Sequence, residues 1–160
     1  MIRKFLNLIG SKLREKRPPI PDTHNYTIKQ YGDFVHFWFR TQGCKYTKDG
    51  YGGCLMCDYS SSNKSLDKIV INYIKEGLSK IDKNSNLILI NSSGSFFDED
   101  EISKDVRVEI YNQLNNYPNL SIIFETLLET INEKKLIELK NILKTQNIDI
   151  EFGIENLNKL

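Results

Sequence analysis

Apolar residues recur at two spacings along this 160-residue chain, and the two spacings predict alternating strands and helices. Runs of consecutive apolar and β-branched residues are typical of strands, and they occur at 34–39, 87–90, 121–125 and 148–154. Apolar residues three or four positions apart are typical of helices, and they occur at 65–81, at 103–117 and from Asn132 through Leu143. The run at 87–90 has no polar alternation, which favours a strand buried on both faces.

This order of elements predicts an α/β fold, a partial (βα) barrel with about four parallel strands. The predicted helices are long enough to serve as crossovers between parallel neighbours. In such folds the reactive groups gather at the carboxyl ends of the strands. The four strand ends carry the cysteine loop, the segment 91–95, Glu125 and Glu155, so we expect these features to converge on one site.

The amino-terminal segment is distinct in charge from the rest of the chain. Residues 1–17 combine six basic residues and one acid with apolar residues at helical spacing, which predicts a basic amphipathic helix. Three prolines within 17–22 cannot continue that helix and form a linker. We therefore divide the chain into residues 1–22 and a core domain, 23–160. The helix suits either packing on the surface or contact with RNA phosphate or a membrane surface.

Composition narrows the class of protein. The net charge of +1 gives no whole-protein argument for binding nucleic acid. No stretch approaches the roughly 20 apolar residues of a membrane-spanning helix, and the first residues lack the apolar region of an export signal. Three cysteines, two of them in a Cys-x-x-Cys pair, suit metal or redox chemistry in a reducing compartment. These features predict a cytoplasmic protein without membrane partners.

Cys44, Cys54 and Cys57 are the candidate metal ligands. Glycines at 50, 52 and 53 lie between the first two cysteines, where they allow the loop to wrap a cluster. Three thiolates would leave one iron of a [4Fe–4S] cluster open to a reacting ligand. Two alternatives are a zinc site completed by His24 or His36, and cysteines that are simply buried. Neither histidine has the spacing of common zinc modules, and His36 falls within a predicted strand, where a packed or hydrogen-bonded role is more usual.

The cysteine loop, Arg-Thr-Gln-Gly-Cys-Lys-Tyr-Thr-Lys-Asp-Gly-Tyr-Gly-Gly-Cys-Leu-Met-Cys-Asp-Tyr at 40–59, resembles that of radical S-adenosylmethionine enzymes. Within that superfamily it is most similar to the radical enzyme of archaeosine biosynthesis and its bacterial relatives, which also have a widened gap between the first two cysteines. The catalytic subunit of elongator is a weaker likeness. Supporting motifs are Asn-Ser-Ser-Gly-Ser-Phe at 91–96, Phe-Glu-Thr at 124–126 and Gly-Ile-Glu at 153–155.

The resemblance implies roles for particular residues. The three cysteines would hold a [4Fe–4S] cluster, whose fourth iron binds the methionine part of S-adenosyl-L-methionine. The remaining cofactor contacts would come from an apolar residue beside the adenine, from the loop after the second strand and from two later strand ends: Met56, Ser93, Gly94, Ser95, Glu125 and Glu155. Each of the two glutamates is equally well explained as a solvated loop residue or a charge at a helix start. The resemblance identifies no catalytic residue.

The function implied is reductive cleavage of S-adenosylmethionine to a 5′-deoxyadenosyl radical, acting on a modified tRNA base. The partners would be tRNA and an electron donor such as flavodoxin or ferredoxin. Barrels of this kind have six βα units or more, whereas the chain stops soon after its fourth predicted strand, so we expect a truncated radical enzyme core. The alternative is a non-catalytic iron–sulfur or zinc binding module. The acidic run 98–101 precedes a helix, and favourable interaction with the helix dipole explains it without a function.

Overall fold

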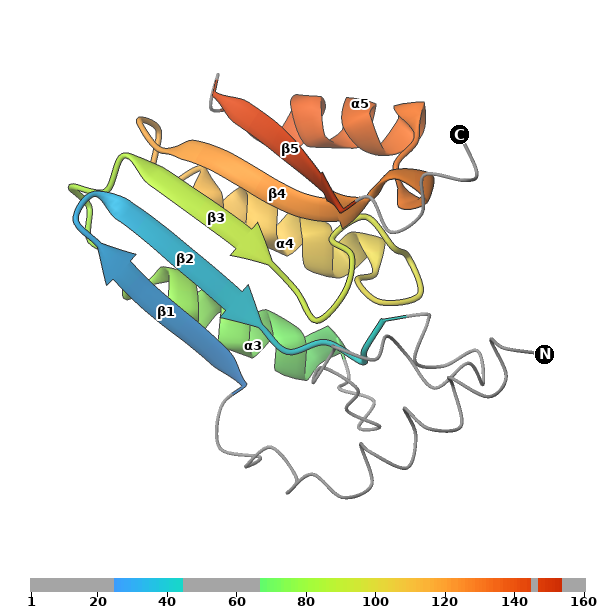
Figure 1. The fold of residues 1–160 in the computed structure, drawn as a ribbon, viewed down its shortest axis with the longest axis horizontal. Helices are drawn as coiled ribbons and strands as arrows, with labels where there is room; N and C mark the ends of the chain where they lie inside the picture. Colours follow the sequence, from blue (N-terminus) through green and yellow to red (C-terminus); the bar gives the residue numbers. More distant parts are fainter. Residues whose placement is uncertain (1–24, 45–66, 145–146, 154–160) are drawn as a thin grey trace, which may run out of the picture.

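The computed structural model describes residues 25–44, 67–144 and 147–153. These residues form one sheet of five strands, β1 (Tyr26–Tyr31), β2 (Phe34–Phe39), β3 (Leu87–Asn91), β4 (Ser121–Leu127) and β5 (Ile148–Gly153). The described helices are α3 (Asp67–Leu78), α4 (Lys104–Leu114), α5 (Glu133–Ile142) and the 3₁₀ turn η1 (Leu128–Thr130). Strands and helices alternate from β2 onwards, as the apolar spacing predicts (Figure 1).

The strands lie side by side in chain order, β1-β2-β3-β4-β5. Strands β2, β3, β4 and β5 run parallel to one another, which confirms four parallel strands. Strand β1 is antiparallel to β2 and was not predicted. Its sequence includes Lys29 and Gln30, because an edge strand that is exposed along part of its length does not need a continuous apolar pattern. Gly32, with φ at 63°, forms the tight turn into β2.

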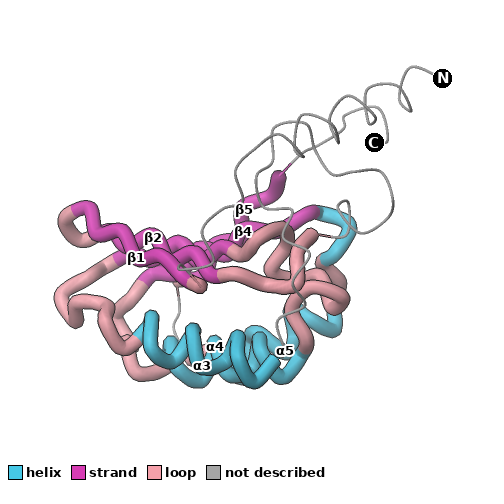
Figure 2. The backbone as a smooth tube through the Cα atoms, turned by 90° about the horizontal axis from the view of Figure 1, so that it is seen from below, coloured by secondary structure: helices cyan, strands magenta, loops and turns pink. Residues whose placement is uncertain are grey.

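The three α-helices form a single layer on one face of the sheet (Figure 2). Burial alternates along β2 and β3, and the fully buried side chains of the strands pack against the helix layer. Leu87 and Leu89 of β3 point to the other face and are half-buried. The prediction that 87–90 is buried on both faces is therefore wrong for the part of the chain that the structure describes. Because Leu87 and Leu89 are apolar although they are only half-buried, the sequence of β3 looks like that of a strand covered on both faces.

Helices α4 and α5 begin next to the first residues of the predicted helical ranges, and those first residues cap them. Ser103 precedes α4, and its hydroxyl accepts a hydrogen bond from Val106 N. Asn132 precedes α5 in the same way and accepts from Lys135 N. Each cap satisfies an amide that has no partner inside the helix. Ser103 and Asn132 therefore mark the ends of the loops that follow β3 and β4.

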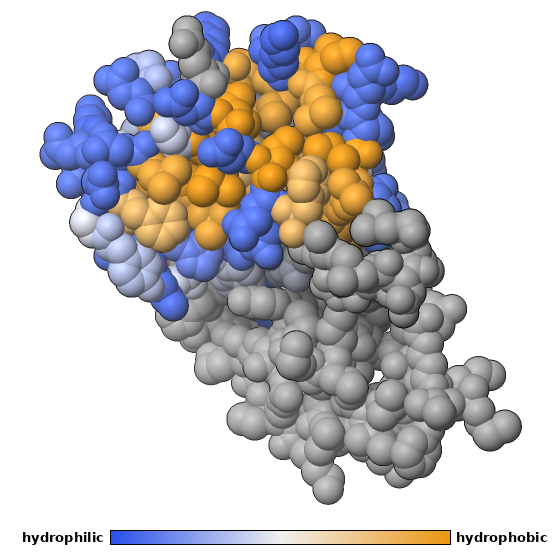
Figure 3. All heavy atoms as spheres, turned by 45° about the horizontal axis from the view of Figure 1, so that its top comes forward, coloured by the Kyte–Doolittle hydropathy of each residue, from blue (hydrophilic) through white to orange (hydrophobic). Residues whose placement is uncertain are grey.

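The described residues have an α/β fold with one five-stranded sheet, and the described strands do not close into the predicted barrel. Strand β5 pairs with β4 alone among the described strands. Apolar side chains gather on the side of the molecule that carries β5 and α5 (Figure 3), where Ile137 and Phe152 are among the exposed large apolar residues. The predicted basic helix and linker at 1–22 lie outside the described residues.

Candidate functional site

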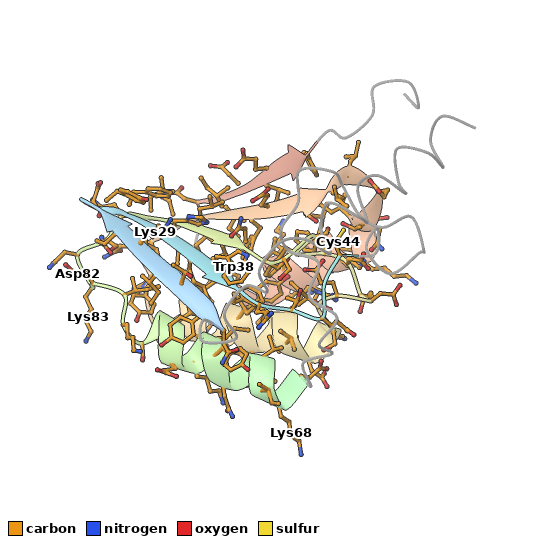
Figure 4. All side chains as sticks on the ribbon, turned by 60° about the horizontal axis from the view of Figure 1, so that its bottom comes forward. Lys29, Trp38, Cys44, Lys68, Asp82 and Lys83 are labelled. Carbon is orange, nitrogen blue, oxygen red and sulfur yellow. The ribbon has the colours of Figure 1, made fainter. Side chains whose placement is uncertain are left out.

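Five of the nine predicted site residues lie in the described part of the chain, and they come from three different strand ends or the loops that follow them. These five are Cys44, Ser93, Gly94, Ser95 and Glu125. The other four lie outside the described residues: Cys54, Met56, Cys57 and Glu155. Cys44 lies at the opposite end of the sheet from Asp82 and Lys83, which precede β3 (Figure 4).

A sharp turn after β2 brings the chain to Cys44. Gly43 has φ at 90°, a conformation that side chains rarely tolerate. Its amide donates a 3.3 Å hydrogen bond to Thr41 Oγ1, which closes the turn. Thr41 N in turn donates to Ser93 Oγ at 3.3 Å, so the turn is attached to the loop after β3. The Thr-x-Gly-Cys part of the motif therefore has a structural role, because Thr41 and Gly43 direct the chain toward the loop after β3.

Gly94 lies directly against Cys44. A Cβ atom at residue 94 would be 2.6 Å from Cys44 Cβ and 3.0 Å from Cys44 Cα. Both distances are too short for carbon atoms, so only glycine fits at this position. Two predicted site residues that are fifty positions apart in the sequence thus come into contact at the carboxyl ends of β2 and β3.

Glu101 joins the two loops and was not predicted as a site residue. Its side chain is buried, with Oε1 accepting a 2.6 Å hydrogen bond from Thr41 Oγ1 and Oε2 accepting a 2.7 Å bond from Ser95 N. Burial raises the pKa of the Glu101 carboxyl above its ordinary value, while the hydrogen bonds from Thr41 and Ser95 act in the opposite direction. The helix-dipole explanation of the acidic run is therefore wrong for Glu101, which connects the turn before Cys44 to the loop carrying Gly94.

The two predicted serines have different surroundings. Ser93 is buried, and its hydroxyl faces the turn at Thr41. The Ser95 hydroxyl lies 2.8 Å from the hydroxyls of both Thr126 and Thr130, and it also accepts a hydrogen bond from Leu127 N. Ser95 therefore ties the loop after β3 to the end of β4. Its hydroxyl and its amide, which donates to Glu101, are therefore both engaged within the protein.

Two cationic side chains hold the loop after β3 from the helix side. The guanidinium of Arg107 is buried and binds Glu99 at 2.8 Å, Glu138 at 3.2 Å and Ile102 O at 3.0 Å. Lys135 Nζ donates to Phe97 O at 2.6 Å. These contacts connect the loop to α4 and α5, so the segment that carries Gly94 is fixed from both sides before any ligand binds.

Glu125 lies on the face of the sheet opposite the helices. Its Oε2 accepts a 2.8 Å hydrogen bond from Asn91 Nδ2, and Asn91 Oδ1 lies 3.1 Å from His36 Nε2. His36 is hydrogen-bonded within the sheet, as its place in a predicted strand suggested. Asn91 opens the predicted loop motif, but nothing in the sequence alone assigns it a partner.

Within the described residues, the site therefore holds one cysteine, Cys44, against Gly94, next to the buried Glu101 carboxyl group and a single loop that carries Ser93 and Ser95. No group of three or more histidine, cysteine, aspartate or glutamate side chains suited to a metal ion occurs within 25–44, 67–144 and 147–153. Cys44 thus needs ligands from elsewhere in the chain to bind a metal. The close approach at Gly94 involves Cys44 Cβ and Cα, so a side chain at residue 94 would displace the chain at Cys44.

Comparisons with known proteins give two archaeal relatives. The chain is 33% identical over 160 aligned residues to an uncharacterized protein of Methanocaldococcus jannaschii, a match that covers 92% of this chain and 43% of that protein. It is 29% identical over 123 residues to archaeosine synthase subunit beta of Methanosarcina acetivorans, with 73% of this chain and 35% of that protein covered. The chain thus spans less than half the length of either relative.

No family model matches the chain, and no solved structure matches it. Similarity to an archaeosine synthase subunit is therefore what the comparisons establish, in agreement with part of the resemblance seen in the cysteine loop. None of the described helices is long and apolar enough to cross a membrane.

Proposed function

We propose that this chain is part of a radical S-adenosylmethionine enzyme whose [4Fe–4S] cluster is held by Cys44, Cys54 and Cys57. The contact between Cys44 and Gly94 carries the proposal, because it brings the first cysteine of the loop against the glycine of a second motif. The match to archaeosine synthase subunit beta supports the same function, since it covers 73% of this chain.

In this proposal, each described residue has a task that follows from its contacts. Gly43 and Thr41 turn the chain so that Cys44 faces the loop after β3. Glu101 keeps that turn and the loop together, and Gly94 lets the chain at Cys44 approach the loop closely. A reduced cluster of this kind supplies one electron that cleaves the cofactor into methionine and a 5′-deoxyadenosyl radical.

The remaining predicted contacts complete the proposal. Met56 would lie beside adenine, while Glu125 and Glu155 would face the cofactor or the substrate from the later strand ends. A modified tRNA base is the proposed substrate, with tRNA and a flavodoxin or ferredoxin as partners in the cytoplasm. Because the relatives are more than twice as long as the matched region, these roles belong to the whole protein and extend beyond the residues described here.

Reductive cleavage of the cofactor tests this function. The full chain is reconstituted anaerobically with iron and sulfide, reduced with dithionite and incubated with S-adenosylmethionine, and 5′-deoxyadenosine is measured by mass spectrometry. We expect 5′-deoxyadenosine to form with the unaltered chain and not with Cys44→Ser. A chain that assembles a cluster but releases no 5′-deoxyadenosine would favour the non-catalytic iron–sulfur module instead.

A further inference from the structure

The Glu101 side chain reaches two loops that follow different strands. Its Oε1 accepts a 2.6 Å hydrogen bond from Thr41 Oγ1, which follows β2, and its Oε2 accepts a 2.7 Å bond from Ser95 N, which follows β3. Each bond uses a different oxygen of one carboxyl group, so the spacing of the two oxygens sets the spacing of the two loops. Because the side chain is buried, removing the carboxyl group leaves both donors without this partner.

The backbone that carries Glu101 is anchored next to α4. Glu101 N donates to Asp98 O at 3.1 Å, and Ile102 N donates to the same oxygen at 2.7 Å. Ile102 O in turn accepts a 3.0 Å hydrogen bond from the buried guanidinium of Arg107, and Ser103 caps α4 directly afterwards. The Glu101 side chain therefore extends from a fixed base, and its length decides which groups its carboxyl oxygens reach.

Two routes connect the Glu101 carboxyl group to Cys44. The Thr41 hydroxyl that donates to Glu101 also accepts a 3.3 Å hydrogen bond from Gly43 N, so it links the carboxyl group to the residue before Cys44. The second route passes through Gly94, because a Cβ atom at residue 94 would lie 2.5 Å from Glu101 Oε2 and 2.6 Å from Cys44 Cβ. A displacement of the carboxyl group would therefore change the position of Cys44 through both loops.

We propose that Glu101 is a positioning residue for Cys44, and that it acts through the geometry of its two hydrogen bonds and not through a negative charge. Both hydrogen-bond partners are neutral groups, a hydroxyl and an amide, and neither needs a charged acceptor. The inference rests on the proposed function in one respect, namely that Cys44 is a metal ligand. Loss of a side chain that orients a metal ligand typically weakens metal binding by about 10- to 100-fold.

Two substitutions separate geometry from charge. In Glu101→Gln the length is kept: the amide oxygen accepts from Ser95 N and the NH₂ group donates to Thr41 Oγ1, whose second lone pair still accepts from Gly43 N. Glu101→Asp keeps the charge, but the side chain is shorter by one carbon–carbon bond, about 1.5 Å, and does not keep both hydrogen bonds. We therefore expect Glu101→Gln to behave like the unaltered chain and Glu101→Asp to behave like Glu101→Ala. This pair decides the proposal even where Glu101→Ala does not fold.

Cobalt(II) reports the number of thiolates at the metal site, because each cobalt–thiolate bond adds to a charge-transfer absorption band. The full chain, reduced and freed of metal, is titrated anaerobically with cobalt(II). The chain has three cysteines, so Cys44→Ser is expected to lower the band by about one third. We expect Glu101→Ala and Glu101→Asp to lower the band by the same fraction and to raise the dissociation constant for cobalt by about tenfold or more.

A double variant, Cys44→Ser with Glu101→Ala, tests whether Glu101 acts through Cys44. We expect it to bind cobalt as Cys44→Ser does, because the thiolate that Glu101 positions is already absent. Glu109→Ala is the matched control, since this half-buried glutamate of α4 bonds to Gln113 and Lys75, and we expect a change of less than about twofold. A further loss in the double variant, or equal losses in Glu101→Ala and Glu109→Ala, would overturn the proposal. Glu101→Gln binding as weakly as Glu101→Asp would also overturn it, as would an unaltered chain without a cobalt–thiolate band.

Amide hydrogen exchange of the metal-free chain gives a second readout. In Glu101→Asp the amides of Gly43 and Ser95 are expected to exchange roughly tenfold faster than in the unaltered chain, whereas Glu101→Gln is expected to leave both unchanged. Unchanged exchange at both amides in Glu101→Asp would contradict the proposal. Neither exchange nor cobalt binding involves S-adenosylmethionine, so a chain that releases no 5′-deoxyadenosine would refute the proposed radical chemistry and leave the role of Glu101 standing.

Discussion

Substituting Gly94 by alanine perturbs the close approach on which the candidate site depends. The added Cβ atom would lie 2.5 Å from Glu101 Oε2, 2.6 Å from Cys44 Cβ and 3.0 Å from Cys44 Cα. Non-bonded carbon atoms normally lie about 3.5–4.0 Å apart, so the methyl group overlaps its neighbours by roughly 1 Å. Since Glu101 is buried and accepts hydrogen bonds on both oxygens, the segment carrying Cys44 has to move.

Overpacking of this kind costs about 1–3 kcal/mol. In a chain of this length such a loss lowers the Tm by about 2–12 °C. We also expect Gly94→Ala to take up less iron, because a binding site tolerates displacement of its ligands by only about 0.5 Å. Thermal unfolding followed by circular dichroism measures the first effect, and the iron content after anaerobic reconstitution measures the second.

Gly77→Ala separates loss of stability from damage to the site. A Cβ atom at residue 77 of α3 would overlap the Phe37 ring in the core and would touch none of the site residues. This variant is expected to unfold at a lower temperature and yet to take up as much iron as the unaltered chain. Full iron uptake and an unchanged Tm in Gly94→Ala would refute the reasoning, and so would an equal loss of iron in both glycine variants.

Three further predictions concern stability. Burial raises the pKa of Glu101 in the folded state, so the stability that Glu101 contributes is present below the ordinary carboxyl pKa and is lost as pH rises through the folded-state pKa. In Glu101→Gln, the free energy of unfolding should therefore decline less steeply over this pH range. Parallel pH profiles of the two proteins would contradict this. Arg107→Met removes the buried guanidinium that binds Glu99, Glu138 and Ile102 O, and it should cost about 3 kcal/mol in urea unfolding. Lys104→Met removes only an exposed ammonium from the same Glu138 and should cost less than about 1 kcal/mol; equal costs would contradict this. Ser103→Ala removes the cap of α4 and should cost about 1 kcal/mol in the same assay, and no change would show that the cap is dispensable.

The sequence predicts the repeating part of the fold well, because the strands and helices that follow one another from 34 onwards have strong and different apolar spacings. The bounds of β2 are the same as those predicted, and α4 and α5 begin one residue after the predicted helical ranges start. Strand β1 is not predicted from the sequence, because its exposed residues are polar and interrupt the run of apolar residues that is typical of a strand. The sequence also cannot show whether helices cover one face of the sheet or both, because the half-buried leucines of β3 look the same in sequence as fully buried ones.

The candidate site divides in the same way. Cys44 and Gly94 are predicted from motifs, and the structure brings them into contact. Glu101 could not be distinguished from its three acidic neighbours in the sequence, because its burial depends on the approach of Thr41 from another strand. Asn91 likewise gains its role only when β2 and β4 lie on either side of β3. Residues whose importance comes from tertiary contacts carry no local pattern that would reveal it.

The central claim is that Cys44, together with Cys54 and Cys57, holds a [4Fe–4S] cluster. The most direct test is the iron and acid-labile sulfide content of the full chain after anaerobic reconstitution. Our account predicts about four irons and about four sulfides per chain. A chain that instead binds a single zinc ion and retains no sulfide would contradict it.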